Sequence, residues 1–441
     1  MDQNPIETGK GGGRPGKISS PGRPRRAGPA HISGLILAIG YLVASPSAAA
    51  GGPPGIGLWA SAQVPAEPQH LLDPEPLGDK TVRNIVRVSA AGRRLRIRLS
   101  NAFGRKPLVI DAAGIARAEA PGEADIVAAS RHRLTFSGSP SVTIAPGREV
   151  WSDPVDMETK AFGDLAISLH FPTALDGETG HGDARSTNFV AQGDQVDLPT
   201  LRNATGIGHW FQLSAIAADG APQARAIVTL GDSITDSYMS SVDGNDRWPD
   251  LLARRLHDRK DLGAWSVLNE GLGGNRVLTD IVGPRLLDRL DRDLFSLPGA
   301  STVILLEGVN DLGALTHDHP VSAEEHRQFV GKLIAAYRLI IDQAHRHGMK
   351  VIGGTIMPYG GSSYYHPDAA NEADRQAVNA WIRAPGHFDG MIDFDGAVRD
   401  PAHPDRLLPA YDSGDHIHPS VAGYQAMADA IPLELLTAPL R

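Results

Sequence analysis

Hydrophobic and polar residues follow two different periods along the chain. Between about residues 59 and 218 they alternate over short runs, most clearly at residues 95–99, where leucine and isoleucine are separated by arginine. This is the pattern of a half-buried strand, and clusters of Pro, Gly and Asp separate one run from the next. Regularly spaced short strands without helical stretches predict a β-sandwich over residues 55–218. Further strands are predicted at residues 133–136, 141–144, 165–171 and 211–216.

Short apolar runs alternate with helical periods in the rest of the chain, residues 224–441. The clearest helix is predicted to begin at Ser322, where Glu325 completes a capping box, and to end at His347 because Gly348 follows. Alternating strands and helices predict a parallel sheet with helices on both faces. In such a sheet substrates bind at the carboxyl ends of the strands, so chemistry is expected directly after each strand. Buried strands are predicted at residues 226–230, 303–306, 350–356 and 391–394.

Residues 1–50 contain no periodic element and have the three features of a secretory signal. Arginines in a Gly- and Pro-rich leader precede an apolar run at residues 32–44, and small residues follow at 48–50. A membrane anchor is the alternative, but the run is shorter than the about 20 residues that span a bilayer. We therefore expect a cleaved signal, a mature chain that starts near Gly51, no stable membrane span after processing, and a secreted or periplasmic protein.

The composition narrows the class of protein. A chain of 441 residues is long enough for two domains, and its 41% hydrophobic and 21% charged residues are ordinary for a globular protein. The formal net charge of −9 argues against a nucleic-acid partner, because phosphate recognition needs clustered positive charge. The chain has no cysteine, which excludes disulfides, thiolate catalysis and cysteine-ligated metal sites.

A candidate nucleophile follows the first predicted strand of the second half, in the sequence Gly231-Asp232-Ser233. A serine on a strand-to-helix turn is exposed, and it lies near a helix N-terminus whose free N–H groups favour a developing negative charge. The alternative is that Asp232 or Ser233 only caps the following helix, a common role for both residue types.

A serine nucleophile needs a base, and the pattern Asp-x-x-His, which occurs three times in the chain, supplies three candidates for it. The third occurrence lies in the sequence Asp415-His416-Ile417-His418, in a loop that leads into the last predicted helix at residues 420–431. Such a loop can direct both side chains toward the sheet edge, with the aspartate fixing the imidazole tautomer. The alternative for His416 and His418 is a pair of metal ligands, although no third ligand group is evident. The three occurrences are Asp342/His345 on a solvated helix face, Asp400/His403 in a Pro-rich loop, and Asp415/His418.

Two further segments can supply donors for an oxyanion. Gly274, in the sequence Gly-Gly-Asn-Arg, follows the second strand, and its backbone N–H can approach a substrate oxygen closely. Asn310 follows the third strand and offers a side-chain amide. Each segment alone is also explained as a tight turn. The chain contains neither the G-x-S-x-G elbow of α/β-hydrolases nor a phosphate-binding loop.

Taken in order, these segments resemble the four blocks of the SGNH (GDSL-type) hydrolases. The resemblance covers about residues 224–432, with Ile234 in place of the leucine in the family's name, and residues 247–252 and 305–311 are similar to the branch that contains acetylxylan esterases. It implies a flavodoxin-like three-layer α/β/α domain preceded by the β-sandwich. The blocks are Gly231-Asp232-Ser233, Gly274 in Gly-Gly-Asn-Arg, Gly308-Val309-Asn310-Asp311 and Asp415-His416-Ile417-His418.

The resemblance implies a carboxylic ester hydrolase that needs neither a cofactor nor a metal. Ser233 is the expected nucleophile, His418 its base and Asp415 the group that orients His418. The expected oxyanion hole consists of the backbone N–H groups of Ser233 and Gly274 and the side chain of Asn310.

Secretion and the added β-domain favour O-acetyl groups on a polysaccharide or oligosaccharide as the substrate. The alternatives are a small-ester or lipid acylhydrolase, a non-catalytic carbohydrate-binding protein on an esterase-like scaffold, and an acyltransferase that uses the same residues. The β-rich segment is equally compatible with a packing domain or lid and with carbohydrate binding, because a fold does not carry a function by itself.

Overall fold

The computed structural model describes residues 55–72, 78–219 and 224–438 of the chain. The segment predicted as a secretory signal, residues 1–50, lies outside the described residues. Within the described ranges, none of the helices combines the length and the apolar character that crossing a bilayer requires.

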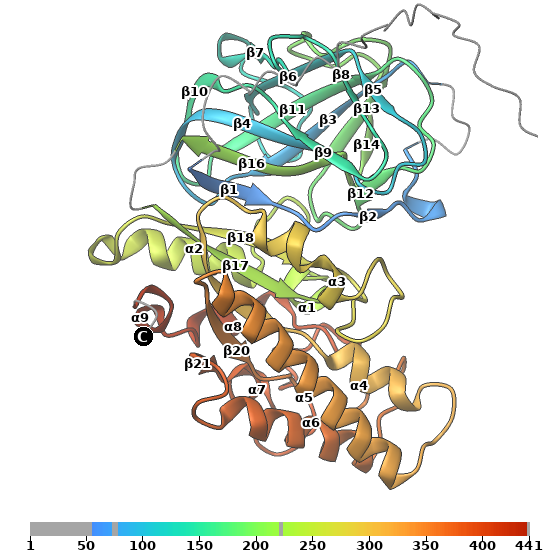
Figure 1. Cartoon of the computed structure of the whole chain (residues 1–441), viewed down its shortest axis with the longest axis vertical. Helices are drawn as coiled ribbons and strands as arrows, with labels where there is room; N and C mark the ends of the chain where they lie inside the picture. Colours follow the sequence, from blue (N-terminus) through green and yellow to red (C-terminus); the bar gives the residue numbers. More distant parts are fainter. Residues whose placement is uncertain (1–54, 73–77, 220–223, 439–441) are drawn as a thin grey trace, which may run out of the picture. The chain divides into compact units, whose positions relative to one another are not determined.

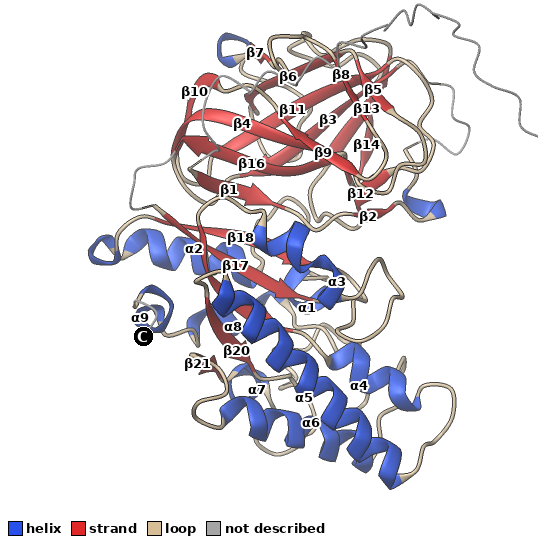
Figure 2. Cartoon of the chain, in the orientation of Figure 1, coloured by secondary structure: helices blue, strands red, loops and turns tan. Residues whose placement is uncertain are grey.

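The β-rich part of the chain is a sandwich of two antiparallel sheets (Figures 1 and 2). One sheet has the strand order β1-β16-β4-β10, with β9 paired to β4, and the other has the order β14-β13-β3-β11-β6-β7. Alternate apolar side chains of both sheets, such as Ile97 on β4 and Ile167 on β11, meet in one core, because successive residues of a strand point to opposite faces. The predicted sandwich is confirmed. Its strands are β1 (Ile56–Ala60), β3 (Lys80–Arg87), β4 (Gly92–Asn101), β6 (Ala112–Arg117), β7 (His132–Arg133), β9 (Arg148–Trp151), β10 (Val155–Thr159), β11 (Asp164–Phe171), β13 (Asn188–Gln192), β14 (Thr205–Ile207) and β16 (Leu213–Asp219).

A small third sheet, with the order β15-β12-β2, joins this part of the chain. Its strands are β15 (Trp210–Phe211), β12 (Thr179–His181) and β2 (Val64–Pro65). The prediction of one continuous strand at residues 211–216 was wrong. Gln212 has a φ of 52° and separates β15 from β16. A strand predicted at 133–136 also ends early, since Phe136 and Ser139 exchange backbone hydrogen bonds in a turn. A two-stranded sheet pairs β5 (Leu108–Ile110) with β8 (Val142–Ile144), and two short 3₁₀ helices are η1 (Pro68–His70) and η2 (Ala128–Ser130).

The α/β part has a parallel five-stranded sheet with the order β18-β17-β19-β20-β21. The first strand along the chain therefore lies between the second and third, which is the flavodoxin-like order predicted from the sequence. Helices cover the sheet and bury a continuous apolar core with it (Figure 2). The strands are β17 (Arg225–Gly231), β18 (Trp265–Gly271), β19 (Ala300–Leu306), β20 (Lys350–Gly354) and β21 (Gly390–Ile392); the helices are α1 (Ser233–Asp236), α2 (Trp248–Asp258), η3 (Lys260–Leu262), α3 (Leu286–Leu290), η4 (Asp291–Phe295), α4 (Val309–Thr316), α5 (Ala323–Arg346), α6 (Ala369–Arg383), α7 (Phe394–Val398), α8 (Val421–Asp429) and α9 (Leu433–Thr437).

Helix termini follow the capping residues of the sequence. Helix α5 begins after Ser322, whose side chain forms the predicted capping box with Glu325. Ser420 caps α8 by accepting from Gly423 N, so the last predicted helix starts one residue later and ends at Asp429. The strand predicted at residues 391–394 stops at Ile392, because the Asp393 side chain accepts from Gly396 N and begins α7.

Hydrogen bonds join the sandwich directly to the α/β part, and strand β1 lies beside β18. The Val267 N–H donates to Ser89 Oγ at 3.0 Å, and the buried Arg98 guanidinium donates to Ser296 Oγ at 2.6 Å. The two parts are therefore held together by polar contacts as well as by packing.

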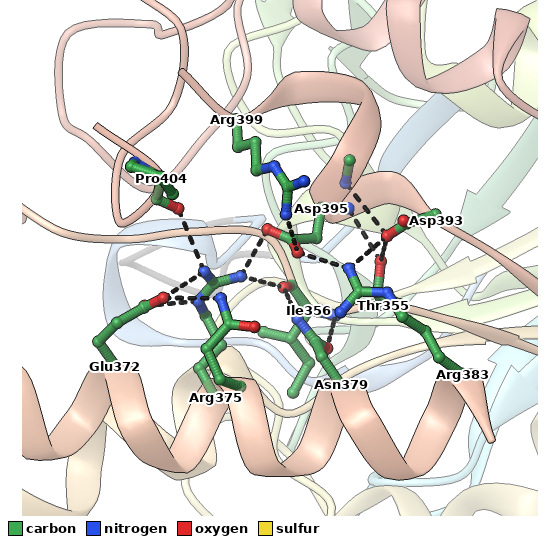
Figure 3. Close-up of polar contacts among 12 residues, drawn as sticks. Thr355, Ile356, Glu372, Arg375, Asn379, Arg383, Asp393, Asp395, Arg399 and Pro404 are labelled. Atoms are coloured by element: carbon green, nitrogen blue, oxygen red, sulfur yellow. Dashed lines mark hydrogen bonds and ion pairs between the residues drawn. The ribbon is translucent and has the colours of Figure 1, made fainter. Parts of the chain in front are cut away.

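A buried ion-pair network anchors the segment that follows β20 (Figure 3). Arg375 on α6 is fully buried and donates to Asp395 at 2.8 Å, to Glu372 at 2.6 Å and to the Ile356 carbonyl at 2.8 Å. Arg383 donates to the other oxygen of Asp395 at 2.6 Å. These bonds fix the start of the loop that runs from β20 to α6.

Candidate active site

Ser233 follows the carboxyl end of β17, the strand between β18 and β19, and is the first residue of α1. The cap of this helix is Asp232, whose side chain accepts from Ile234 N at 2.9 Å. The Ser233 hydroxyl is thus not used for capping, and it lies 2.7 Å from His418 Nε2. The sequence left open which of the two residues caps α1, and the structure assigns that role to Asp232.

His418 and Asp415 form the next contact of this chain of hydrogen bonds. Asp415 Oδ2 lies 2.6 Å from His418 Nδ1, and Asp415 Oδ1 accepts from the backbone N–H groups of Ile417 and His418, both at 2.9 Å. Burial opposes ionisation of Asp415, but these hydrogen bonds outweigh it and hold its pKa well below the usual range. With Asp415 ionised, His418 Nδ1 donates to the carboxylate, which leaves Nε2 to accept the proton of Ser233.

The other aspartate–histidine candidates point elsewhere. His345 contacts Asp389 at 2.8 Å, and Asp400 accepts from Ala402 N within its own turn. His416 Nδ1 lies 2.5 Å from Asp412 Oδ2, so it does not share a site with His418. Among the residues that the structure describes, no three His, Asp or Glu side chains are grouped as metal ligands.

Gly274 follows β18 and Asn310 follows β19, the two strands that flank β17 in the sheet. Gly274 has a φ of 69°, a left-handed conformation that glycine adopts without steric cost and that sets the direction of its N–H. The Asn310 Nδ2 group donates to the Asn275 carbonyl at 2.9 Å, and its Oδ1 accepts from the Tyr365 hydroxyl at 2.8 Å. Both ends of the amide are therefore held, and one N–H of Nδ2 remains for a ligand.

The model of the GDSL-like lipase/acylhydrolase family matches residues 229–426. The matched segment contains Ser233, Gly274, Asn310, Asp415 and His418. The chain carries a GDSL-like lipase/acylhydrolase domain. It is accordingly a hydrolase of carboxylic esters, as the sequence predicted, and its fold of parallel sheet and preceding β-sandwich is the one expected.

Solved structures resemble the GDSL domain at low overall similarity. An acetylxylan esterase from Geobacillus stearothermophilus is 21% identical, with a TM-score of 0.36, and the match covers 48% of this chain and 94% of that one. An α/β-hydrolase enzyme from the metagenome of Lake Arreo, Spain, is 23% identical, with a TM-score of 0.35 and coverages of 48% and 94%. A GDSL-like lipase from Bacteroides thetaiotaomicron is 17% identical, with a TM-score of 0.35 and coverages of 48% and 87%. Comparison with the curated proteins gives no significant match.

Two tyrosines of the GDSL domain join the candidate site without having been predicted. Tyr365, in the loop after β20, orients the Asn310 amide, and Tyr238, just after α1, packs its ring 4.9 Å from that of His418. Neither lies in a recognisable sequence pattern. Only the folded chain brings Tyr365 to Asn310, 55 positions away.

The carboxyl groups of Asp232 and Asp311 are buried near Ser233. Burial raises the pKa of Asp232 to about 7 and that of Asp311 to about 6. Asp311 accepts from the backbone N–H groups of Val277 and Leu278 at 2.9 and 3.0 Å. These bonds tie the segment that contains Gly274 to α4, which carries Asn310, and so fix the two candidate oxyanion donors relative to each other.

Proposed function

We propose that the protein is a secreted serine esterase that removes O-acetyl groups from a carbohydrate by way of an acyl-enzyme on Ser233. The observation that carries the mechanism is the continuous hydrogen-bonded chain from Asp415 through His418 to Ser233, with contacts of 2.6 and 2.7 Å. A hydroxyl, an imidazole and a carboxylate in this order are the groups that activate a serine nucleophile.

In the first half of the reaction, Ser233 Oγ attacks the ester carbonyl carbon while its proton passes to His418 Nε2. The carbonyl oxygen becomes an oxyanion, which the N–H groups of Ser233 and Gly274 and the free N–H of Asn310 Nδ2 stabilise. Asp415 stabilises the imidazolium that forms. The tetrahedral intermediate then collapses, the alcohol leaves with the proton from Nε2, and the acyl group stays on Oγ.

In the second half of the reaction, water hydrolyses the acyl-enzyme. It attacks the acyl carbon as His418 Nε2 takes one of its protons, and the same donors hold the second oxyanion. When this intermediate collapses, Nε2 returns the proton to Ser233 Oγ and the carboxylic acid is released. Each group acts twice, and no metal or cofactor takes part in this scheme.

Secretion is supported by the signal-like pattern of residues 1–50, and the acetyl preference by composition. Only 5% of the residues are aromatic, and the sequence contains no long apolar lid segment of the kind that a long-chain lipase would use. Hydrolysis of p-nitrophenyl esters of increasing chain length tests the acetyl preference. Faster cleavage of long chains than of acetate would contradict it and favour a lipid acylhydrolase.

The replacement Ser233→Ala tests the mechanism. We expect kcat for p-nitrophenyl acetate to fall by at least about 10⁴-fold, because the nucleophile is lost. A fluorophosphonate probe should label the wild-type protein and the control Ser241→Ala, whose serine is exposed, but not Ser233→Ala. A non-catalytic binding protein would show no labelling, and a fully active Ser233→Ala protein would disprove the mechanism.

The two histidines of the last block give a matched pair of variants. His418→Ala should lose activity to the same degree as Ser233→Ala, since both remove part of one unit. His416→Ala should stay within about threefold of wild type, because its ring contacts Asp412 and lies outside the hydrogen-bonded chain. Equal losses in the two variants would show that the base has been assigned wrongly.

A further inference from the structure

A cavity of about 260 Å³ lies between the β-rich part and the candidate active site. Two of its lining residues belong to that site. Gly274 is a proposed oxyanion donor, and Tyr238 packs against the ring of His418 at 4.9 Å. The cavity therefore adjoins the candidate active site through these two residues.

The opposite wall comes from the small sheet β15-β12-β2 and the helix η1. His70 of η1 and His209, which precedes β15, pack their rings against each other at 4.4 Å. Gly182 is required for this arrangement, because a Cβ there would lie 2.6 Å from His70 Nδ1. Val64 of β2 packs with Leu272 in a small apolar cluster at the base of the wall.

Polar contacts fix this wall relative to α1, the helix of the nucleophile. His181 of β12 is fully buried, with Nε2 3.1 Å from Asp236 of α1 and Nδ1 2.8 Å from the Ala62 carbonyl. Burial acts to lower the pKa of His181, but the Asp236 carboxylate outweighs it and raises that pKa. Both ring nitrogens face acceptors, so the imidazolium donates to both parts of the chain. Arg185 adds a bond to the Ser240 carbonyl at 2.8 Å.

The lining of the cavity combines aromatic rings with hydrogen-bonding groups. Tyr238 supplies most of the accessible aromatic surface, because Trp210 and Phe211 are buried, and His209 supplies a polar ring. Burial and the neighbouring His70 lower the pKa of His209, which favours the neutral ring. Its Nδ1 accepts from Asp183 N at 3.4 Å, so Nε2 carries the proton and is a donor. Aromatic faces and directed polar groups together match the two kinds of surface of a sugar ring.

The volume and polarity of the cavity favour a sugar ring over an acetyl group or a long acyl chain. Small-molecule sites usually enclose about 300–1,000 Å³, so a cavity of about 260 Å³ suits one small ring and is far larger than an acetyl group needs. A long acyl chain would favour a uniformly apolar lining, because each buried polar group without a partner is unfavourable. The His209 ring and the Asp183 carboxylate in the lining argue against such a chain.

We propose that this cavity binds a sugar unit of the substrate, so that the β-rich part contributes directly to substrate recognition through the sheet β15-β12-β2 and His209. The inference rests on the proposed esterase function and specifies how it selects carbohydrate esters. Of the alternatives for the β-rich part, it favours carbohydrate binding, in a cavity that adjoins the candidate active site.

The variant His209→Phe tests the proposal in the full-length protein, because it keeps a ring against His70 but removes the hydrogen-bonding nitrogens. We expect kcat/KM for acetylated xylobiose, divided by kcat/KM for p-nitrophenyl acetate, to fall about tenfold, through KM, as for the loss of one hydrogen bond to a ligand. His132→Phe is the control, since His132 lies on β7 in another sheet, and should change this ratio by less than about twofold. Ala66→Trp fills the cavity from the same wall and should lower the ratio as well.

Other outcomes would overturn the inference. An unchanged ratio in both His209→Phe and Ala66→Trp, with folding verified by circular dichroism, would show that no sugar occupies the cavity. A larger loss on p-nitrophenyl octanoate than on acetylated xylobiose would assign the cavity to an acyl chain. A wild-type enzyme that cleaves p-nitrophenyl acetate but no acetylated sugar would refute it too. The proposed esterase function is tested separately, because only full activity of Ser233→Ala would refute it.

Discussion

Replacing Tyr365 by phenylalanine removes the hydroxyl that orients the amide of Asn310. That hydroxyl donates to Asn310 Oδ1 at 2.8 Å in a buried environment, while the Nδ2 group donates to the Asn275 carbonyl. Burial raises the pKa of Tyr365 above its ordinary value, so the hydroxyl stays protonated and acts as a donor at every working pH. Without it, only one contact holds the amide in the orientation that presents an N–H to the oxyanion.

The size of the effect follows from the state of Asn310 Oδ1. A buried acceptor that loses its donor is destabilised by about 1–3 kcal/mol, which corresponds to about 5- to 150-fold in a rate. Because the contact with the Asn275 carbonyl remains, we expect the lower part of this range, a decrease in kcat of about 5- to 30-fold. Complete loss of the amide in Asn310→Ala should lower kcat by about 10²–10³-fold, the usual effect of one oxyanion donor.

Steady-state hydrolysis of p-nitrophenyl acetate measures both effects, and KM should change little because the donor acts on the transition state. Tyr364→Phe is the control: the adjacent ring is 60% exposed, and its hydroxyl has no part in the proposed mechanism. In the double variant of Tyr365 and Asn310, the phenylalanine should add almost nothing to the loss caused by alanine. Additive losses, or equal effects of Tyr364→Phe and Tyr365→Phe, would refute the argument.

Three further outcomes are expected. Asp415→Asn should lower kcat by about 10⁴-fold with a small change in KM, because the amide no longer fixes the tautomer of His418; a loss below tenfold would contradict this role. Folding raises the pKa of Asp232 from 3.8 to about 7, so this group stabilises the fold below about pH 4 and that contribution is lost as the pH rises to about 7. Asp232→Asn should flatten the fall in melting temperature between about pH 4 and 7, and an unchanged profile would contradict the raised pKa. In urea unfolding, Arg375→Met should lower the free energy of unfolding by about 3–5 kcal/mol because it leaves a buried carboxylate with one partner fewer, whereas the half-exposed Arg399→Met should cost less than about 1 kcal/mol; similar losses would show that burial is not the cause.

The periods of hydrophobic residues and the local capping patterns determined much of the fold. Alternation in the first half predicts the sandwich, and the change of period beyond residue 222 predicts the parallel sheet, because side-chain direction repeats every two residues in a strand and about every 3.6 in a helix. Caps such as Ser322 are fixed by bonds within one turn, so sequence alone locates them. The sequence pattern does not predict a strand boundary that depends on one backbone angle, as at Gln212.

The sequence also determined which strand ends carry Ser233, Gly274 and Asn310, because parallel strands bring their carboxyl ends to one edge. The spacing Asp-x-x-His and the family resemblance also pointed to His418 as the base, but the contact between His418 and Ser233, 185 positions apart, is made only in the folded chain. Nor could the sequence find Tyr365 at Asn310 or the wall formed by β15, β12 and β2. These contacts join segments far apart in the chain, and no local sequence pattern predicts them. They arise only when tertiary packing brings the surfaces together.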